Sequence, residues 1–219
     1  WEATAFWEKL KRGVQSYKQW SMETMLEKKP EEIWPNHYLR EFGFPAGTIA
    51  AISEKLAQTW ETVHYHRGLR PNVEQTLEEL RRRGYKLGII SNTASLYSVF
   101  NVLEEYGIRQ YFADVTLSSV TGYRKPHPSI FEIAVRQMRS APSSCMYVGD
   151  TVSRDILGAR RAGFSRVVQI SPRMTEESDA QVRQSSHTAD YVMTGAFTEL
   201  VDYVQAASGR KQTTVLKNS

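Results

Sequence analysis

From residue 71 onward the sequence alternates short apolar runs with longer stretches of helical periodicity. The apolar runs, which are typical of buried strands, cover residues 86–90, 114–117, 145–148, 166–170 and 191–193. Helical patterns cover residues 94–106, 129–138, 155–162 and 197–207, and another precedes the first strand. Strands that alternate with helices predict an α/β fold with a mostly parallel sheet covered on both faces by helices.

Residues 1–66 have a different pattern and are expected to form a separate helical domain. Apolar residues recur every three or four positions from Phe6 to Tyr17, which places them on one helix face. Pro30 is expected to open a second helix and Pro35 to break the pattern. Residues 67–208 would then form the α/β core, and the polar residues 209–219 are predicted to be a flexible tail.

Composition narrows the classes of protein. The net charge of +4 is small and the basic residues are scattered, so no nucleic-acid partner is expected. No apolar run approaches the length of a membrane span, and no membrane association is expected. The single cysteine, Cys145, lies in an apolar run and excludes an internal disulfide, which favours a reducing, cytoplasmic compartment.

Two acids follow the apolar run 145–148. Gly149 and Asp150 stand where that strand should end, and Asp155 stands at the start of the next helical pattern. Carboxylates at the carboxyl end of a parallel strand suit a hard cation such as Mg²⁺. Asp150 and Asp155 are therefore candidate metal ligands. The alternative is that Asp150 is a loop residue and Asp155 a helix cap.

Polar residues also follow the first two strands. Ser91 and Asn92 come directly after residues 86–90, and Lys125 lies in the loop after residues 114–117. Because parallel strands end at the same edge of a sheet, these side chains should meet near Asp150. A hydroxyl, an amide and an ammonium group together can bind a phosphoryl group. Alternatively, Ser91 and Asn92 cap the next helix and Lys125 is an ordinary surface lysine.

In this order the motifs resemble those of the haloacid dehalogenase-like hydrolase superfamily. Ser91-Asn92-Thr93 resembles its second motif, Lys125 with the following prolines its third, and Gly149-Asp150 with Asp155 its fourth. The resemblance implies a Rossmann-like three-layer α/β/α sandwich with a mobile helical cap. It also implies that Ser91 binds the transferred phosphoryl group, that Lys125 stabilises nucleophile and phosphate, and that the two acids hold Mg²⁺.

The sequence departs from the family at its first motif, Asp-x-Asp, whose first acid is the nucleophile. No aspartate precedes Asp114. In the family's strand order, the strand carrying this motif lies between those ending at Ile90 and Val148. We therefore expect that the chain is not the whole gene product, or that a partner strand completes the sheet. The given chain alone is predicted to be inactive.

The expected function of the complete protein is Mg²⁺-dependent hydrolysis of a small phosphorylated metabolite through an aspartyl-phosphate. A phosphomutase would share all of these residues. A 2-haloacid dehalogenase needs no magnesium, and the acid pair Asp150 and Asp155 argues against it. A catalytically inactive, phosphatase-like binding or regulatory module is the alternative from another class.

Overall fold

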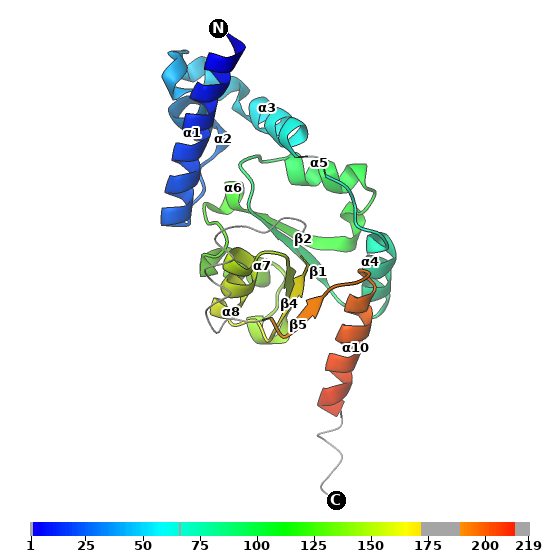
Figure 1. Cartoon of the computed structure of the whole chain (residues 1–219). Coiled ribbons are helices and arrows are strands. Elements are labelled where there is room, and N and C mark those ends of the chain that lie inside the picture. The colour runs from blue at the N-terminus through cyan, green and yellow to red at the C-terminus, as the bar shows by residue number, and fades with distance from the viewer. Residues whose placement is uncertain (1, 66, 172–188, 213–219) are drawn as a thin grey trace, which may run out of the picture.

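The computed structural model describes residues 2–65, 67–171 and 189–212. Two parts are distinguished by their secondary structure (Figure 1). Residues 2–64, here called the helical lobe, contain helices and connecting turns. Residues 67–171 and 189–212, here called the α/β lobe, contain the parallel strands and the helices packed on them. The mixed α/β fold predicted from the alternating pattern is confirmed.

The helical lobe is held together by aromatic and aliphatic side chains. Its elements are α1 (Ala3–Thr24), α2 (Pro30–Ile33), the π-helical turn η1 (Trp34–Tyr38), the 3₁₀ turn η2 (Arg40–Phe42) and α3 (Ala46–His64). Its buried cluster comprises Leu10, Tyr17, Ile33, Trp34, Tyr38, Leu39, Phe42, Ile49 and Ala57. Trp60, which is partly buried, packs against this cluster, whereas Trp7 is largely exposed. Most of the lobe's aromatic residues therefore serve packing between helices.

Pro35 does not end the helical path as the sequence predicted. Pro30 begins α2, and the chain then widens into the π-helical turn η1, which contains Pro35 near its start. The amide of Leu39 donates to the carbonyl oxygen of Trp34 at 2.8 Å. A wider turn accommodates proline at its first residues, because the missing N–H would have no partner there.

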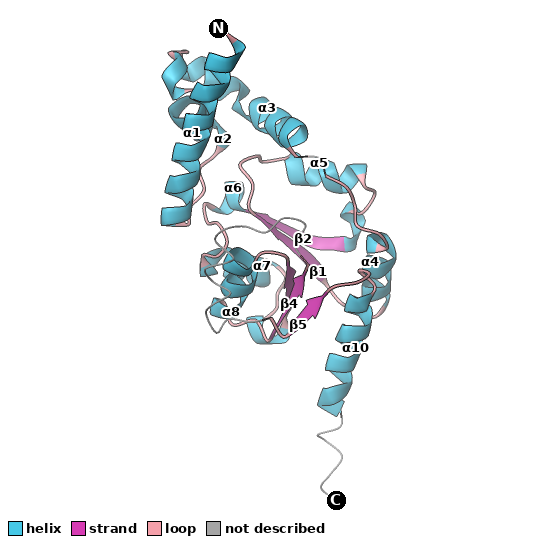
Figure 2. Cartoon of the chain, viewed as in Figure 1, coloured by secondary structure: helices cyan, strands magenta, loops and turns pink. Residues whose placement is uncertain are grey.

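In the α/β lobe, helices cover both sides of the strands (Figure 2). Its strands are β1 (Leu87–Ser91), β2 (Phe112–Leu117), β3 (Met146–Gly149), β4 (Arg166–Ile170) and β5 (Tyr191–Met193). Its helices are α4 (Val73–Arg82), α5 (Ser98–Glu105), α6 (Ser118–Thr121), α7 (Pro128–Gln137), the π-helical turn η5 (Val152–Ile156), α8 (Leu157–Arg161) and α10 (Glu199–Gln212). Helices α7 and α8 pack on one side, and α4 and α10 pack on the other.

The described strands form two separate parallel sheets. β1 pairs with β2, and β3, β4 and β5 form the second sheet in that order. Strands β1 and β3 face each other across a cavity of about 690 Å³. The cavity is lined by residues 86–90, which include most of β1, and by residues 144–148, which include most of β3. Apolar side chains of α4, α7 and α10 also line it. The break lies between the two strands that the sequence predicted to have unpaired edges.

Two strand boundaries match the sequence prediction, and the other elements differ from it by one to a few residues at their ends. Strands β4 and β5 have the predicted bounds, and β1 begins one residue late. The last helix, α10, runs to Gln212 rather than ending near residue 207, so part of the predicted tail is helical. The rest of that tail, residues 213–219, lies outside the described residues.

Candidate active site

Lys125 lies where the ends of β1 and β3 come together. Its ammonium nitrogen donates to the carbonyl oxygen of Ile90 at 3.0 Å, to Tyr147 Oη at 3.1 Å and to Asp155 Oδ1 at 2.7 Å. A lysine ammonium has three donors, and each has an acceptor here. One acceptor belongs to β1 and the other two belong to β3 and the turn after it. Lys125 therefore joins the two sheets at the carboxyl end of their facing strands.

Asp155 is buried and is the counter-ion of Lys125. Its Oδ1 also accepts a hydrogen bond from Tyr147 Oη at 2.8 Å, and its Oδ2 accepts from the amide and hydroxyl of Thr151 at 3.1 and 2.6 Å. Burial acts to raise the pKa of Asp155. The charge of Lys125 and the hydrogen bonds from Lys125, Thr151 and Tyr147 outweigh burial and hold the pKa well below its ordinary value.

The position of Asp155 depends on a glycine before it. A Cβ atom on Gly149 would lie 2.5 Å from Asp155 Cβ and 2.6 Å from its Cγ. Only glycine lets the strand end approach the carboxylate so closely. The Gly-Asp pair at the end of β3 thus positions two acids: Asp150 lies in the loop that follows, and Asp155 packs against Gly149.

Asp150 differs from Asp155 in its surroundings. It is exposed, and its Oδ1 lies 3.2 Å from Thr151 Oγ1. An exposed carboxylate beside the strand end can offer an oxygen to a hard cation, so Asp150 fits the predicted metal role. Both oxygens of Asp155 already accept two hydrogen bonds each, so its part in metal binding stays a prediction. Across residues 2–65, 67–171 and 189–212, no group of three or more His, Cys, Asp or Glu could hold a metal ion.

Asn92 supports Lys125 through the main chain. Its Nδ2 donates to the carbonyl oxygen of Lys125 at 3.1 Å, and its Oδ1 accepts from the Lys125 amide at 2.8 Å. The side-chain amide of Asn92 thus holds the main chain of Lys125, and its predicted part in phosphate binding stays a prediction. The sequence predicted that both residues lie at one site, and the structure brings them into direct contact.

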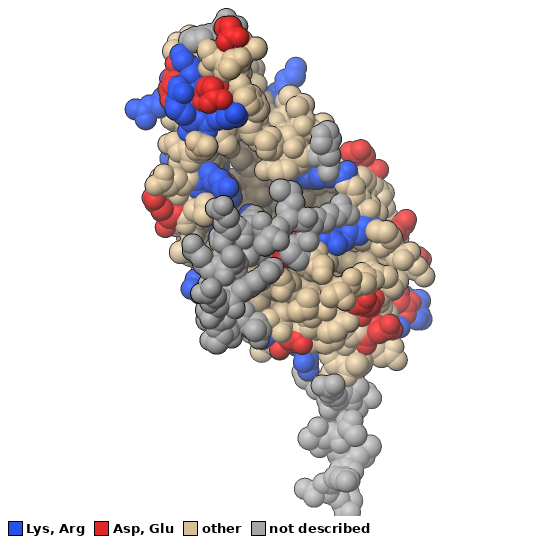
Figure 3. Space-filling view, in the orientation of Figure 1, with Lys and Arg blue, Asp and Glu red and all other residues tan. Residues whose placement is uncertain are grey.

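Ser91 lies at the end of β1 and lines a cavity of about 200 Å³. Asn92, Thr93, Glu61 and Arg67 also line it, with apolar side chains of α5. Arg67 forms an ion pair with Glu61 at the junction between the helical and α/β lobes. On the face drawn in Figure 3, Lys and Arg side chains lie beside the hollow between the lobes. These charges suit an anionic ligand.

Sequence reasoning missed Tyr147 and Thr151, which complete the environment of Asp155. Tyr147 lies in the apolar run that the sequence predicted to be a strand, and no polar role was predicted for it. It is buried, and burial together with the charge of Asp155 and their hydrogen bond raises the pKa of its phenol. Buried tyrosines usually have a hydrogen-bond partner, so a tyrosine two residues before a Gly-Asp pair was a usable signal.

Comparison with known proteins supports the interpretation of these motifs. A family model for the haloacid dehalogenase-like hydrolases matches residues 1–163. This chain belongs to the haloacid dehalogenase-like hydrolases. The family predicted from the motifs at Ser91, Lys125 and Asp150 is confirmed, and these positions lie within the matched residues.

Phosphatases of sugar phosphates are among the relatives of this haloacid dehalogenase-like chain. It is 32% identical over 156 residues to the glyceraldehyde 3-phosphate phosphatase of Methanothermobacter thermautotrophicus, covering 68% of each chain. It is 31% identical over 150 residues to the ribulose-1,5-bisphosphate 5-phosphatase of Halopiger xanaduensis, covering 65% of this chain and 60% of that one. The alignments thus leave 32% of the first relative and 40% of the second uncovered.

The fold of this haloacid dehalogenase-like chain also matches a solved structure. The 2-haloacid dehalogenase of Pseudomonas syringae superposes with a TM-score of 0.65 at 20% identity, over 94% of this chain and 82% of that one. At this identity the likeness concerns the fold, which confirms the predicted Rossmann-like class. No helix in the part of the chain that the structure describes is long and apolar enough to cross a membrane.

Proposed function

We propose that this chain forms most of a Mg²⁺-dependent phosphatase site that hydrolyses a small phosphorylated metabolite. The observation that carries the proposal is the contact of Lys125 with both facing strands, together with the exposed Asp150 directly after β3. A positive charge and an exposed carboxylate at the carboxyl ends of these strands suit a phosphoryl dianion and the cation that accompanies it. The sugar-phosphate phosphatases among its relatives support this substrate class.

Each residue has a distinct role in the proposal. The Ser91 hydroxyl donates a hydrogen bond to a phosphoryl oxygen, and Lys125 supplies positive charge close to the reacting group. Asn92 holds the Lys125 main chain, and this contact makes it a positioning residue. Asp150 would hold Mg²⁺, which neutralises negative charge on the phosphoryl oxygens when bound. Asp155 pairs with Lys125 and holds its ammonium in place.

The attacking carboxylate is proposed to come from an extended segment that lies between β1 and β3. The cavity there is lined by the facing strands and apolar side chains, and Lys125 lies at the end of both strands. The segment belongs to the same protein or to a partner chain. Its carboxylate oxygen would bond to phosphorus as the ester P–O bond breaks, and the leaving alkoxide would take a proton from the second aspartate of the Asp-x-Asp motif on the same segment. Water would then release inorganic phosphate and regenerate the carboxylate.

The test uses an aryl phosphate and a synthetic peptide with an apolar strand ending in Asp-x-Asp. The chain with peptide and Mg²⁺ should hydrolyse the ester, a chelator should abolish turnover, and Lys125→Met should remove most of it. A peptide whose first aspartate is replaced by asparagine is the matched control and should bind without turnover. Turnover that survives the chelator would refute the metal assignment, and equal turnover with the asparagine peptide would refute the nucleophile.

A binding module without catalysis is the second candidate. It is favoured by the three internal hydrogen bonds of Lys125, which leave its ammonium with a full set of acceptors inside the protein. Binding of inorganic phosphate without turnover in the presence of the Asp-x-Asp peptide would favour this candidate. A phosphomutase would instead return an isomeric sugar phosphate, which product analysis detects. Cytoplasmic location and the lack of a nucleic-acid partner stay predictions.

A further inference from the structure

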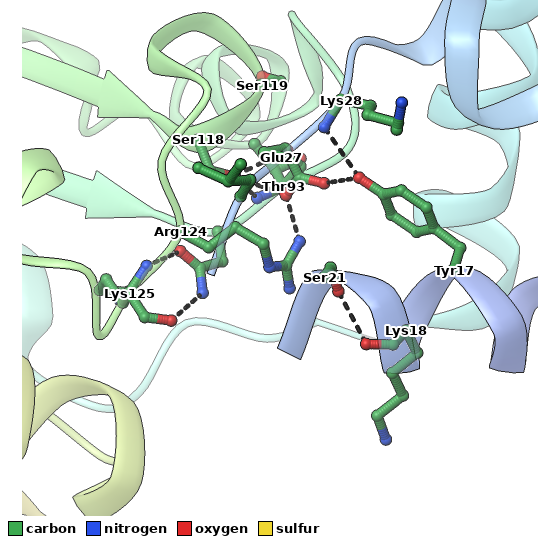
Figure 4. Close-up of polar contacts among 12 residues, drawn as sticks. Tyr17, Lys18, Ser21, Glu27, Lys28, Thr93, Ser118, Ser119, Arg124 and Lys125 are labelled. Carbon is green, nitrogen blue, oxygen red and sulfur yellow. Dashed lines mark hydrogen bonds and ion pairs between the residues drawn. The ribbon is translucent and has the colours of Figure 1, made fainter. Parts of the chain in front are cut away.

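A second polar cluster lies where the helical lobe meets the α/β lobe. It consists of Tyr17, Glu27, Ser118 and Arg124, here called the Glu27 cluster (Figure 4). The Glu27 carboxylate accepts hydrogen bonds from the Tyr17 hydroxyl, from Ser118 Oγ at 2.9 Å, and from the Arg124 guanidinium, with which it forms an ion pair. Glu27 comes from the helical lobe, whereas Ser118 and Arg124 belong to the α/β lobe.

The main chain joins the two lobes at the same place. Leu26 and Tyr123 form an antiparallel bridge. The amide of Glu27 donates to the carbonyl oxygen of Gly122 at 2.9 Å, and the amide of Arg124 donates to the carbonyl oxygen of Met25 at 2.9 Å. The residue directly before Lys125 is therefore held by the helical lobe through both its main chain and its side chain.

The Glu27 cluster also reaches the loop after β1. Ser118 Oγ, which contacts Glu27, accepts a hydrogen bond from the amide of Thr93 at 2.9 Å and lies 3.1 Å from the carbonyl oxygen of Thr93. Thr93 follows Ser91 and Asn92, and Asn92 pairs with the main chain of Lys125. One carboxylate from the helical lobe thus contacts the Lys125 loop directly, at Arg124, and reaches the loop after β1 through Ser118.

Because Glu27 is buried, its position depends on the side chains that form hydrogen bonds with its carboxylate. Its side chain is fully buried. Burial raises the pKa of Glu27 above its ordinary value, although Arg124 and the hydrogen bonds from Tyr17 and Ser118 act in the opposite direction. A buried carboxylate that loses a partner is costly, so the surrounding loops are constrained to keep their donors in place.

We propose that Glu27 is a positioning residue. It fixes the position of the Lys125 ammonium through Arg124 and the position of the loop that carries Ser91 through Ser118. Docking of the helical lobe and the geometry of the site would then be coupled through one side chain. The importance of Lys125 for phosphoryl binding rests on the proposed function, but the coupling itself does not.

A direct measurement is the exchange rate of the Lys125 ammonium protons in protein labelled with ¹⁵N-lysine. In the wild-type chain this buried ammonium, with its three acceptors, should exchange slowly, and Lys125→Arg assigns its signal. In Glu27→Gln the protons should exchange about tenfold faster or more, as expected when a hydrogen-bonded charge is removed from a buried network. Glu23→Gln is the matched control, because Glu23 is an exposed residue of the same lobe.

Amide exchange at Val168, which is fully buried in β4, distinguishes local loosening from global unfolding. If Glu27→Gln does not fold, Arg124→Gln, which removes the ion pair with Glu27 next to Lys125, is measured instead, with the same expectation. Faster exchange at Lys125 without faster exchange at Val168 supports the coupling. Unchanged exchange at Lys125, or an equal change at both positions, overturns it.

Titration with inorganic phosphate separates this inference from the proposed function. A positioning role predicts that Glu27→Gln weakens phosphate binding by about tenfold, whereas Glu23→Gln leaves it unchanged. If the wild-type chain, with peptide and Mg²⁺, binds no phosphate, the proposed function fails. The ammonium exchange still decides the role of Glu27 in that case.

Discussion

At the scale of single residues, Asp155 and Lys125 form the charged centre of the α/β lobe. The carboxylate accepts four hydrogen bonds and the ammonium donates three, all within the protein. Both side chains are largely withdrawn from water, with exposures of 3% and 13%. A pair in this setting is costly to break from one side, because the remaining charge stays buried.

Replacing Asp155 with asparagine keeps the shape and removes the charge. We expect Asp155→Asn to lower the free energy of unfolding by about 3–5 kcal/mol, since Lys125 is left without a counter-ion. Glu8→Gln removes one partner of the exposed Lys11–Glu8 pair and should change it by less than about 1 kcal/mol. Urea unfolding measures both. Similar small effects would show that the buried pair contributes no more than a surface one.

Acid should destabilise the fold through the same carboxylate. The folded state holds the pKa of Asp155 below its ordinary value, whereas an unfolded aspartate titrates near pH ~3.9. The unfolded state then binds the proton first, so the contribution of Asp155 is complete above about pH 5 and declines as the pH falls further. The unfolding free energies of wild type and Asp155→Asn should therefore approach each other as the pH falls below about 5. A constant difference over this range would contradict the assignment.

At the scale of elements, glycines decide how closely neighbouring segments approach. In α1, a Cβ atom on Gly13 would lie 2.5 Å from the carbonyl oxygen of His37 and 2.7 Å from that of Tyr38, both in η1. In α3, a Cβ atom on Gly47 would have nothing within 4 Å. The first helix of the lobe therefore packs directly against the turn that contains Pro35.

The same substitution should have opposite effects at these two positions. Gly13→Ala should lower the free energy of unfolding by about 1–3 kcal/mol, because the main chain of η1 has to move away. Gly47→Ala should raise it by up to about 0.5–1 kcal/mol, because alanine loses less backbone freedom in a helix. Thermal unfolding of the two variants checks this contrast. Stabilisation by both would mean that α1 and η1 can separate without cost.

At the scale of the whole molecule, the main feature is the cavity between β1 and β3, the facing strands of the two sheets. Its volume of about 690 Å³ is within the range of ligand-binding pockets, and strands form its facing walls. Strands with unpaired edges that face each other can each form a ladder with one additional strand, as in strand addition between chains. The proposed catalytic segment therefore has a structural role as well as a chemical one.

A peptide that occupies this cavity should stabilise the chain. At a free concentration 100 times its Kd, an apolar strand peptide should raise the free energy of unfolding by about 2.7 kcal/mol and displace a fluorescent apolar dye bound in the cavity. A matched peptide with a central proline should do neither, because proline cannot complete the hydrogen-bond ladder. Equal stabilisation by both peptides would place the binding site elsewhere.

The sequence by itself determined the local elements and the composition of the site. Strands β4 and β5 and most of β1 follow from apolar runs, because strand formation in a buried sheet depends on apolar residues that are adjacent in sequence. The order of strand ends also placed Lys125 near Asp150 and Asp155. Family membership followed from the same motifs and is confirmed by the match over residues 1–163.

Tertiary structure alone decided which partner each polar group has. Glu27 and Arg124 are 97 positions apart, and Lys125 and Asp155 are 30 apart, so no local periodicity connects them. Their pairing depends on where the lobes and the strand ends pack. The same holds for Asp155, which the sequence predicted to bind a metal: the fold pairs it with Lys125, and its part in metal binding stays a prediction. The physical reason is that a buried charge takes the partner that the surrounding backbone brings within reach, and that backbone is positioned by packing across the whole chain.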